Sequence, residues 1–223
     1  CGACTDVCYG KVQTEDIVLE ARREENGHNN SLMYKTIIYL KGEKKLFDLC
    51  LKILFFFHRI KLSYLADKLG LFYLLGYPSL SKAYKKLIKT PKKFLHNEIK
   101  HLTDTTNDIK WIYFATCGTD YLFTNVGKAS INVLKKIYGN GVFMNNECCG
   151  LISYNYGSLD DAKKLALKNI ERYESIRSKH PDVFVVGDCS SCIAFMKSYP
   201  QMFMDDENIY KRAVEFSSNV RDI

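Results

Sequence analysis

Cysteines are the residues of this chain with the clearest capacity for chemistry, and their spacing is uneven. The nine cysteines form five groups: Cys1, Cys4 and Cys8; Cys50; Cys117; the adjacent pair Cys148 and Cys149; and Cys189 with Cys192. Thiolates are soft ligands that favour zinc, copper(I) and iron–sulfur clusters. An odd number argues against a complete disulfide framework, which a chain of 223 residues does not need for stability. Metal ligation is therefore the first chemistry to consider.

The first group lies in the stretch CGACTDVC and has the spacing C-x2-C-x3-C. Bacterial ferredoxins use C-x2-C-x2-C-x3-C-P, so the stretch matches the last three cysteines of that run. The first cysteine of the run would precede Cys1, and Tyr9 stands where proline is usual. The spacing predicts that Cys1, Cys4 and Cys8 are ligands of an iron–sulfur cluster, with zinc as the alternative.

The elements that must position the later cysteines read as strands alternating with helices. Short apolar runs at 111–116, 141–144 and 183–186 predict three strands. Apolar residues spaced by three and four between Leu122 and Ile137 predict a helix. Ser158 and Asp161 resemble a capping box that opens a second helix. Two more helices are expected, from Asp188 and over about 206–220. This alternation predicts an α/β fold with parallel strands and right-handed crossovers.

Placed on these elements, the later cysteines gather at one edge of the predicted sheet. Cys117 follows the first strand directly, Cys148 and Cys149 follow the second by four and five residues, and Cys189 and Cys192 follow the third. The carboxyl ends of parallel strands are where open α/β sheets bind ligands. We therefore expect one shared metal site, in which two adjacent thiols serve two metal atoms or two positions of one cluster.

Local features of that site carry further expectations and alternatives. A helix that starts near Cys189 favours thiolate there, and Gly150 permits a tight turn or a close approach. A disulfide between Cys148 and Cys149 would be strained, so we discount it. Structural zinc bound by four of the five thiols, and separate core roles for each, remain as alternatives.

The sequence before residue 111 reads differently, as a helical region. Thr14 begins a short predicted helix that runs to Arg23. Residues 31–100 are predicted to be all helical, and 101–108 to be a linker. We expect domains at 1–30, 31–108 and 109–223. Cys50 is expected to be a small buried hydrophobe, and the apolar stretch 51–60 to be core or subunit interface.

Composition limits the classes of partner. The formal net charge is +7, with lysines concentrated in 82–100, which predicts a solvated basic face or a docking face for an acidic partner or anionic membrane. No nucleic-acid-binding motif accompanies it, so we expect no nucleic acid partner. The five histidines show no metal-ligand spacing. We find neither a run long enough to span a membrane nor a signal peptide, and a first residue that is not methionine leads us to expect a fragment.

The spacing C-x30-C-C-G-x38-C-x2-C, from Cys117 to Cys192, resembles the cysteine-rich CCG domain. That domain occurs in subunits of heterodisulfide reductase, glycolate oxidase, lactate-utilisation systems and anaerobic glycerol-3-phosphate dehydrogenase. A ferredoxin-type segment, helices and then a CCG domain look most like the glycolate oxidase iron–sulfur subunit. Such proteins usually carry two CCG domains, whereas these residues hold one.

The resemblance implies an iron–sulfur electron-transfer subunit of a flavin-linked dehydrogenase for a 2-hydroxy acid such as glycolate or lactate. It implies a cubane 4Fe–4S cluster at the amino-terminal cysteines, and a cubane or non-cubane cluster held by Cys117, Cys148, Cys149, Cys189 and Cys192. A flavoprotein and a further iron–sulfur subunit are the implied partners. The sequence has no G-x-G-x-x-G fingerprint, so the flavin is expected on another chain. Such clusters suit a reducing cytoplasm, with association at the cytoplasmic face of the membrane left open. Disulfide reduction at the CCG cluster and a structural zinc module are the alternatives.

Overall fold

The computed structural model describes residues 7–10, 12–26, 39, 43–74, 81–82, 85, 87, 90–102 and 108–223. Cys1 and Cys4 lie outside these residues, as do parts of the predicted helical region and linker. The upstream elements are α2 (Thr14–Asn26), α4 (Lys44–Arg59), α5 (Leu62–Lys68), α6 (Leu71–Leu74) and α8 (Leu95–Glu98).

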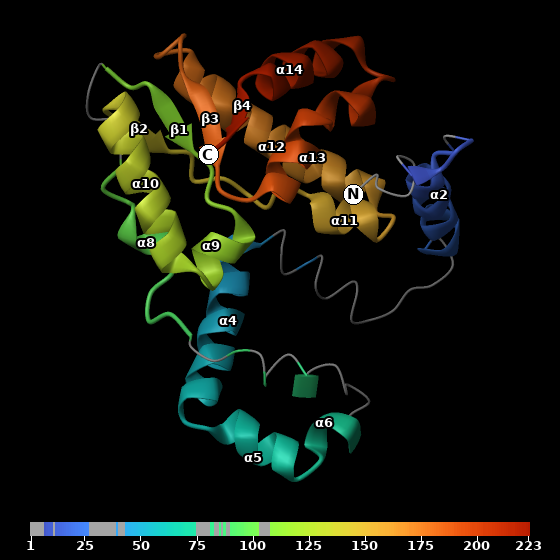
Figure 1. The fold of residues 1–223 in the computed structure, drawn as a ribbon, viewed down its shortest axis with the longest axis vertical. Coiled ribbons are helices and arrows are strands. Elements are labelled where there is room, and N and C mark those ends of the chain that lie inside the picture. Colours follow the sequence, from blue (N-terminus) through green and yellow to red (C-terminus); the bar gives the residue numbers. More distant parts are fainter. Residues whose placement is uncertain are drawn as a thin grey trace.

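From residue 111 the chain alternates between strands and helices, as the sequence predicts. The elements are β1 (Trp111–Tyr113), α9 (Cys117–Tyr121), α10 (Thr124–Tyr138), β2 (Gly141–Phe143), α11 (Leu151–Asn155), α12 (Leu159–Arg177), β3 (Phe184–Gly187), α13 (Ser190–Lys197), the 3-10 helix η1 (Tyr199–Phe203), α14 (Glu207–Ser218) and β4 (Val220–Asp222). The four strands pair in parallel in the order β2-β1-β3-β4 (Figure 1). The α/β architecture is confirmed.

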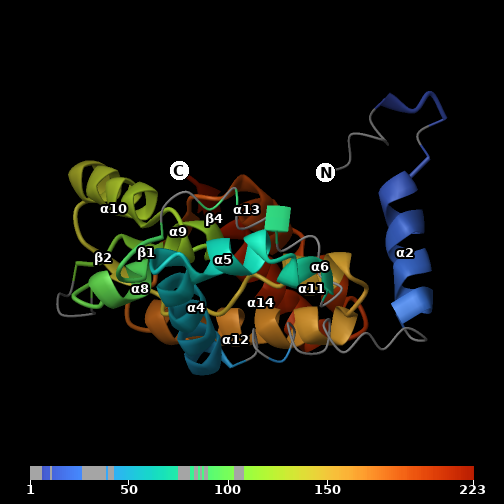
Figure 2. The same cartoon turned by 90° about the horizontal axis from the view of Figure 1, so that it is seen from below.

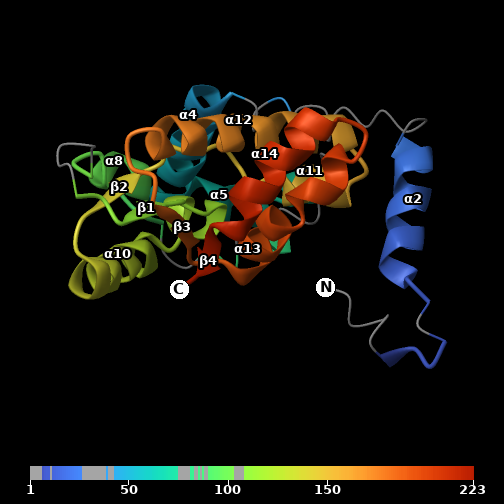
Figure 3. The ribbon, with the colours of Figure 1, turned by 90° about the horizontal axis from the view of Figure 1, so that it is seen from above.

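Helices cover both faces of this sheet, which explains why its strands are apolar without alternation. On one face Ile112 and Val185 pack with α12, α13 and α14 in a single buried cluster. On the other face Trp111 and Val186 pack with α8 and α10. Figure 3 shows α10 on one side of the strands and α12 and α14 on the other. Because neither face is open to water, the strand ends are held in fixed positions.

Two sequence expectations differ from the structure at element ends. The predicted last helix stops at Ser218, and Val220–Asp222 forms β4 beside β3, with Val220 opposite Val185. Val220 is buried, so the apolar position at the chain's end serves the sheet. Ser158 is the residue before α12, as expected, but its hydroxyl donates to the Asp161 carboxylate at 2.6 Å rather than capping a backbone N–H.

Besides α8, which packs on the sheet, α4 also contacts the residues that follow β1. Phe55 of α4 packs against Phe94 and Tyr121 in a small cluster beside α9. Figure 1 shows α4 next to α9, with α5 farther from the strands, and Figure 2 shows the same helices seen from below. The expectation of a buried Cys50 is wrong, because α4 exposes that position, and in 51–60 only Phe55 is fully buried. Among the described residues, no helix combines the length and apolarity needed to cross a membrane.

One packing contact of the sheet gives a test of this architecture. A Cβ atom on Gly141 of β2 would lie 2.2 to 2.4 Å from three ring atoms of Trp111, whose side chain is fully buried. We expect Gly141→Ala to lower the free energy of unfolding by about 1–3 kcal/mol, since the rigid indole must move. Urea unfolding under reducing conditions measures the change.

Gly118→Ala in α9 is the matched control. A Cβ there meets no atom closer than 3.9 Å, so its effect should stay within about 1 kcal/mol and favour the helix. Equal stabilities of the two variants would contradict the packing of Trp111 over β2.

Candidate metal centre

The first cysteine contact joins the ends of β1 and β2. Cys117 is the first residue of α9, and Cys148 lies in the loop after β2. Their Sγ atoms are 3.6 Å apart, although 30 residues separate them along the chain. The convergence that the strand ends predict is therefore present for this pair.

The second contact joins the same loop to the end of β3. Cys149 Sγ lies 3.3 Å from Cys192 Sγ, and Cys189 also interacts with Cys192. Because Cys148 and Cys149 are adjacent and their thiols interact, the five cysteines form a connected series. We call it the thiol row; its members in order are Cys117, Cys148, Cys149, Cys192 and Cys189. None of the described cysteines is in a disulfide.

The thiol row is buried in its middle and half-buried elsewhere. Cys149 and Cys192 are 2% and 8% exposed and belong to the larger core cluster. Hydrogen bonds with Cys148 and Cys192, together with burial, raise the pKa of the Cys149 thiol well above its usual range. A thiolate there needs a compensating cation, and a bound metal provides one.

Two opposing effects act on the pKa of Cys189, and the sequence indicated only one of them. Cys189 immediately precedes α13, and the backbone amides of Ser191 and Cys192 act to lower its pKa, as expected for a helix start. Burial acts more strongly in the other direction, so the pKa of Cys189 is raised overall. The helix start therefore favours thiolate at Cys189, as expected, although burial outweighs this contribution.

The donor set fits a thiolate-bound metal centre, but the thiols form a row and not a cage. Among the residues that the structure describes, no three His, Cys, Asp or Glu side chains surround one point as ligands of a single ion. Tetrahedral bonds of about 2.3 Å place neighbouring sulfurs about 3.8 Å apart, close to the two contacts seen here. Soft donors of one kind, in contact across three loops, suit zinc or an iron–sulfur cluster.

Two asparagines hold the loop that carries Cys148 and Cys149. Asn146 exchanges two hydrogen bonds of 2.9 Å with the backbone of Ala115, which ties the loop to the end of β1. Asn169 of α12 accepts from the Glu147 amide at 2.9 Å and donates to the Cys148 carbonyl at 3.1 Å. Both side chains are buried. These contacts fix the backbone on either side of Glu147.

A hydrogen bond also fixes the backbone at Cys149, the second residue of the cysteine pair. The Tyr199 hydroxyl donates to the Cys149 carbonyl at 2.6 Å, and its ring is fully buried. Gly150 follows with φ 92°, and a Cβ there would lie 3.3 Å from the Ala162 carbonyl oxygen. The positive φ confirms the expectation of a tight turn at Gly150, and the alternative, a close approach to a cofactor, stays a prediction.

Asp188 connects the third loop to the first. Its carboxylate accepts hydrogen bonds from Tyr113 at 2.6 Å and from Thr116 and Thr119 at 2.9 Å. Burial and the Asp188 charge raise the pKa of Tyr113, which keeps the phenol a donor. Because Thr116 and Asp188 directly precede Cys117 and Cys189, this carboxylate sets the relative position of two cysteine loops.

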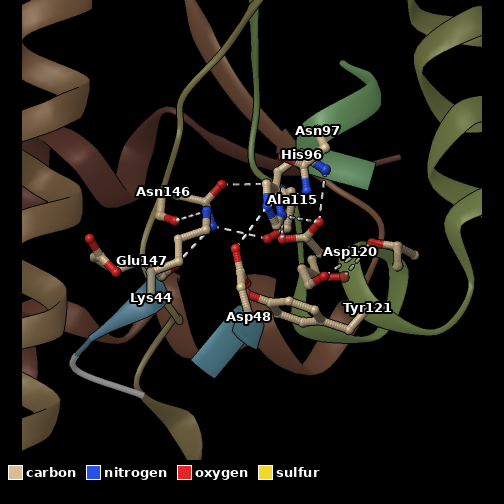
Figure 4. Close-up of polar contacts among 11 residues, drawn as sticks. Lys44, Asp48, His96, Asn97, Ala115, Asp120, Tyr121, Asn146 and Glu147 are labelled. Atoms are coloured by element: carbon tan, nitrogen blue, oxygen red, sulfur yellow. Dashed lines mark hydrogen bonds and ion pairs between the residues drawn. The ribbon is translucent and has the colours of Figure 1, made fainter. Parts of the chain in front are cut away.

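A small cavity of about 40 Å³ lies beside Cys117 and Cys148. Its wall includes Lys44 and Phe47 of α4, so the region before the sheet contributes to the site. Lys44 Nζ donates to the Asn146 carbonyl at 3.1 Å. Figure 4 shows Lys44 next to Asn146 and Glu147. The cavity has room for ordered water.

Other predicted site residues are placed less completely. Cys8 is half-buried, and its two predicted co-ligands lie outside the described residues, so the amino-terminal cluster stays a prediction. The histidine spacing did not single out His96, which is buried between carboxylates near α9. Asn146 and Asp188 were also missed, although polar residues between a strand end and a cysteine are a visible signal.

Comparisons with known proteins agree with this geometry. The family model of the cysteine-rich CCG domain matches residues 111–197, which include all five members of the thiol row. No solved structure matches the chain.

Curated relatives match this chain over segments of a length similar to that of the family match. Lactate utilization protein A of Exiguobacterium is 35% identical over 94 residues, which are 42% of this chain and 37% of that protein. The proteins of the same name from Bacillus velezensis and Bacillus subtilis are 32% and 35% identical over 111 and 94 residues. These alignments cover 49% and 42% of this chain and 44% and 37% of the two proteins. The chain thus spans less than half the length of these relatives.

The segment that matches the CCG cysteine-rich domain, residues 111–197, is thus the one whose strand ends bring the five cysteines together.

Proposed function

We propose that this chain is an iron–sulfur electron-transfer component of a system that oxidises a 2-hydroxy acid such as lactate or glycolate. The observation that carries the proposal is the thiol row, in which cysteines from three strand ends are in contact at one edge of the sheet. The names of the curated relatives support lactate as the substrate of the whole system.

The thiol row would hold the metal centre through Cys117, Cys148, Cys149, Cys189 and Cys192. An iron–sulfur cluster supplies one-electron redox chemistry when it is bound. The protein excludes water around Cys149 and Cys192, which lie in the core, and leaves the other three thiols nearer the surface. Burial and hydrogen bonds to sulfur are the means by which a protein sets a cluster's potential.

Substrate oxidation is assigned to a partner flavoprotein. The chain has no glycine-rich dinucleotide fingerprint. Cys1, Cys4 and Cys8 would hold a second, cubane 4Fe–4S cluster that completes the electron-transfer role. A reducing cytoplasm suits both centres.

Direct disulfide reduction at the CCG site is the second candidate function. The half-buried positions of Cys117, Cys148 and Cys189 favour it, since a thiol substrate could approach from that side. The paramagnetic spectrum of the oxidised protein, recorded with and without an added thiol substrate, separates the two. An unchanged spectrum favours the electron-transfer role.

Metal analysis tests the proposal as a whole. Protein purified without oxygen should contain iron and acid-labile sulfide and should show the visible absorption of an iron–sulfur protein. A colourless protein that holds zinc and lacks sulfide would overturn the redox function and favour a structural zinc module.

Cys149→Ser tests the thiol row directly. We expect it to abolish or convert the CCG-site cluster while sparing the amino-terminal one, because Cys149 is the buried member that contacts both Cys148 and Cys192. Iron and sulfide per chain, with electron paramagnetic resonance, measure the loss. Cys50→Ser is the matched control, since that thiol is exposed on α4 and should leave the iron content unchanged.

Asp188→Ala tests the connection between the first and third loops. Removing the acceptor of three hydroxyl groups frees the loops that carry Cys117 and Cys189 to move apart. We expect metal affinity to fall about 10- to 100-fold, the usual cost of losing a group that orients ligands. Iron retention against a chelator measures this loss.

Asp182→Ala provides the comparison for Asp188, because Asp182 is exposed at the opposite end of β3. Equal iron retention in both variants would show that Asp188 does not position the ligands.

A further inference from the structure

His96 lies at the centre of a buried polar contact that joins three helices. This contact involves none of the cysteines of the CCG spacing. His96 Nδ1 lies 2.8 Å from Asp120 Oδ1, and its Nε2 lies 3.1 Å from Asp48 Oδ2. His96 is on α8, Asp48 on α4 and Asp120 on α9. Figure 4 shows the imidazole between the two carboxylates. We call this contact the His96 bridge.

The imidazole has polar partners on both sides. Nδ1 lies within hydrogen-bond distance of both Asp120 carboxylate oxygens, and Nε2 faces Asp48 and lies 3.0 Å from the Asn97 amide nitrogen. Asp120 also accepts the backbone amide of His96 at 2.9 Å, and Asp48 also accepts the Tyr121 hydroxyl at 2.8 Å. These partners satisfy a site in which His96 and Asp120 are buried.

The bridge acts on the short helix that carries a member of the thiol row. α9 has five residues, from Cys117 to Tyr121, and both Asp120 and Tyr121 belong to it. With so few intrahelical hydrogen bonds, the helix depends on outside contacts for its position. The His96 bridge ties its end to α4 and α8, while Thr116 and Thr119 tie its start to Asp188.

We propose that His96 is a positioning residue for Cys117: through Asp120 it fixes α9 and so keeps the Cys117 thiol beside that of Cys148. The assignment of Cys117 as a metal ligand rests on the proposed function, but the positioning of its thiol does not. His96 and Asp48 come from α8 and α4, so the segment before the CCG domain contributes to the position of α9.

The contacts around Cys149 and Cys192 offer an internal comparison. This pair is held by the core cluster with α12 and α13 and by the Tyr199 hydroxyl on the Cys149 carbonyl. The contacts that form the His96 bridge join α4, α8 and α9 and do not involve these groups. Loss of the bridge should therefore loosen one thiol pair and spare the other.

Oxidation of the metal-free, reduced full chain by diamide tests the proposal. Diamide accepts two electrons and two protons from two thiols, which form a disulfide. Trypsin separates Cys117, the 148–149 pair and the 189–192 pair into the peptides 111–128, 137–163 and 180–197, so mass spectrometry distinguishes the cross-links. Wild-type protein should give cross-links between the first and second peptides and between the second and third.

In His96→Ala we expect the yield of the first cross-link to fall by about tenfold or more, because proximity-driven steps are sensitive to displacements of about 1 Å. The second cross-link should stay within about twofold of wild type. His96→Asn should restore most of the first yield, since its amide can donate to Asp120 in place of Nδ1–H. His101→Ala, at an exposed histidine, is the matched control and should behave as wild type.

A parallel loss of both cross-links would show a general loss of fold and would overturn the positioning role. Unchanged yields in His96→Ala, or no recovery in His96→Asn, would overturn it as well. If the wild-type chain binds no iron and His96→Ala still loses only the first cross-link, the result contradicts the proposed function and supports this inference.

Discussion

The structure depends on one constraint: three loops that leave parallel strands must present thiols at contact distance. Parallel pairing brings the strand ends to one edge, but neighbouring strands are about 4.8 Å apart, so pairing alone does not join the sulfurs. The remaining precision comes from hydrogen bonds between loops. Asn146 joins the second loop to the first, and Asp188 joins the third to the first. The first loop, at the end of the central strand β1, is the common reference for both.

These polar contacts do not lower the stability of the fold, because each polar group has hydrogen-bond partners. Buried amide and carboxylate groups cost stability when they lack partners, and here Asn146, Asn169 and Asp188 each have two or more. The surrounding sheet is covered on both faces, so its strand ends do not move independently. Apolar packing thus supplies the stability, and the loop hydrogen bonds supply the position.

Much of the fold could be predicted from the sequence because apolar runs and helical periodicity are local signals. The three strands that precede cysteines, their parallel pairing and the convergence of their thiols all follow from those signals. β4 was missed because Val220–Asp222 continues a helical pattern, and its strand state comes from pairing with β3. Cys50 was misjudged because apolar density does not tell which side of α4 faces the sheet.

His96 shows a different limit of sequence reading. Its partners Asp48 and Asp120 lie 48 and 24 residues away, and no spacing rule connects a lone histidine to two distant carboxylates. Within a lysine-rich run the residue reads as part of a charged surface. Only tertiary packing of α4 against α9 makes it a buried imidazole between two carboxylates.

The two thiol contacts are therefore held by different forces. Cys149 and Cys192 sit in the apolar core, where close packing leaves little room for displacement. Cys117 and Cys148 sit at a polar boundary, where hydrogen bonds across separate segments define their positions and a small cavity adjoins them. A centre bound along this row would have one rigid side and one side whose geometry depends on α4, α8 and α9. Changes in how the helical region contacts α9 would then reach the thiols without altering the sheet.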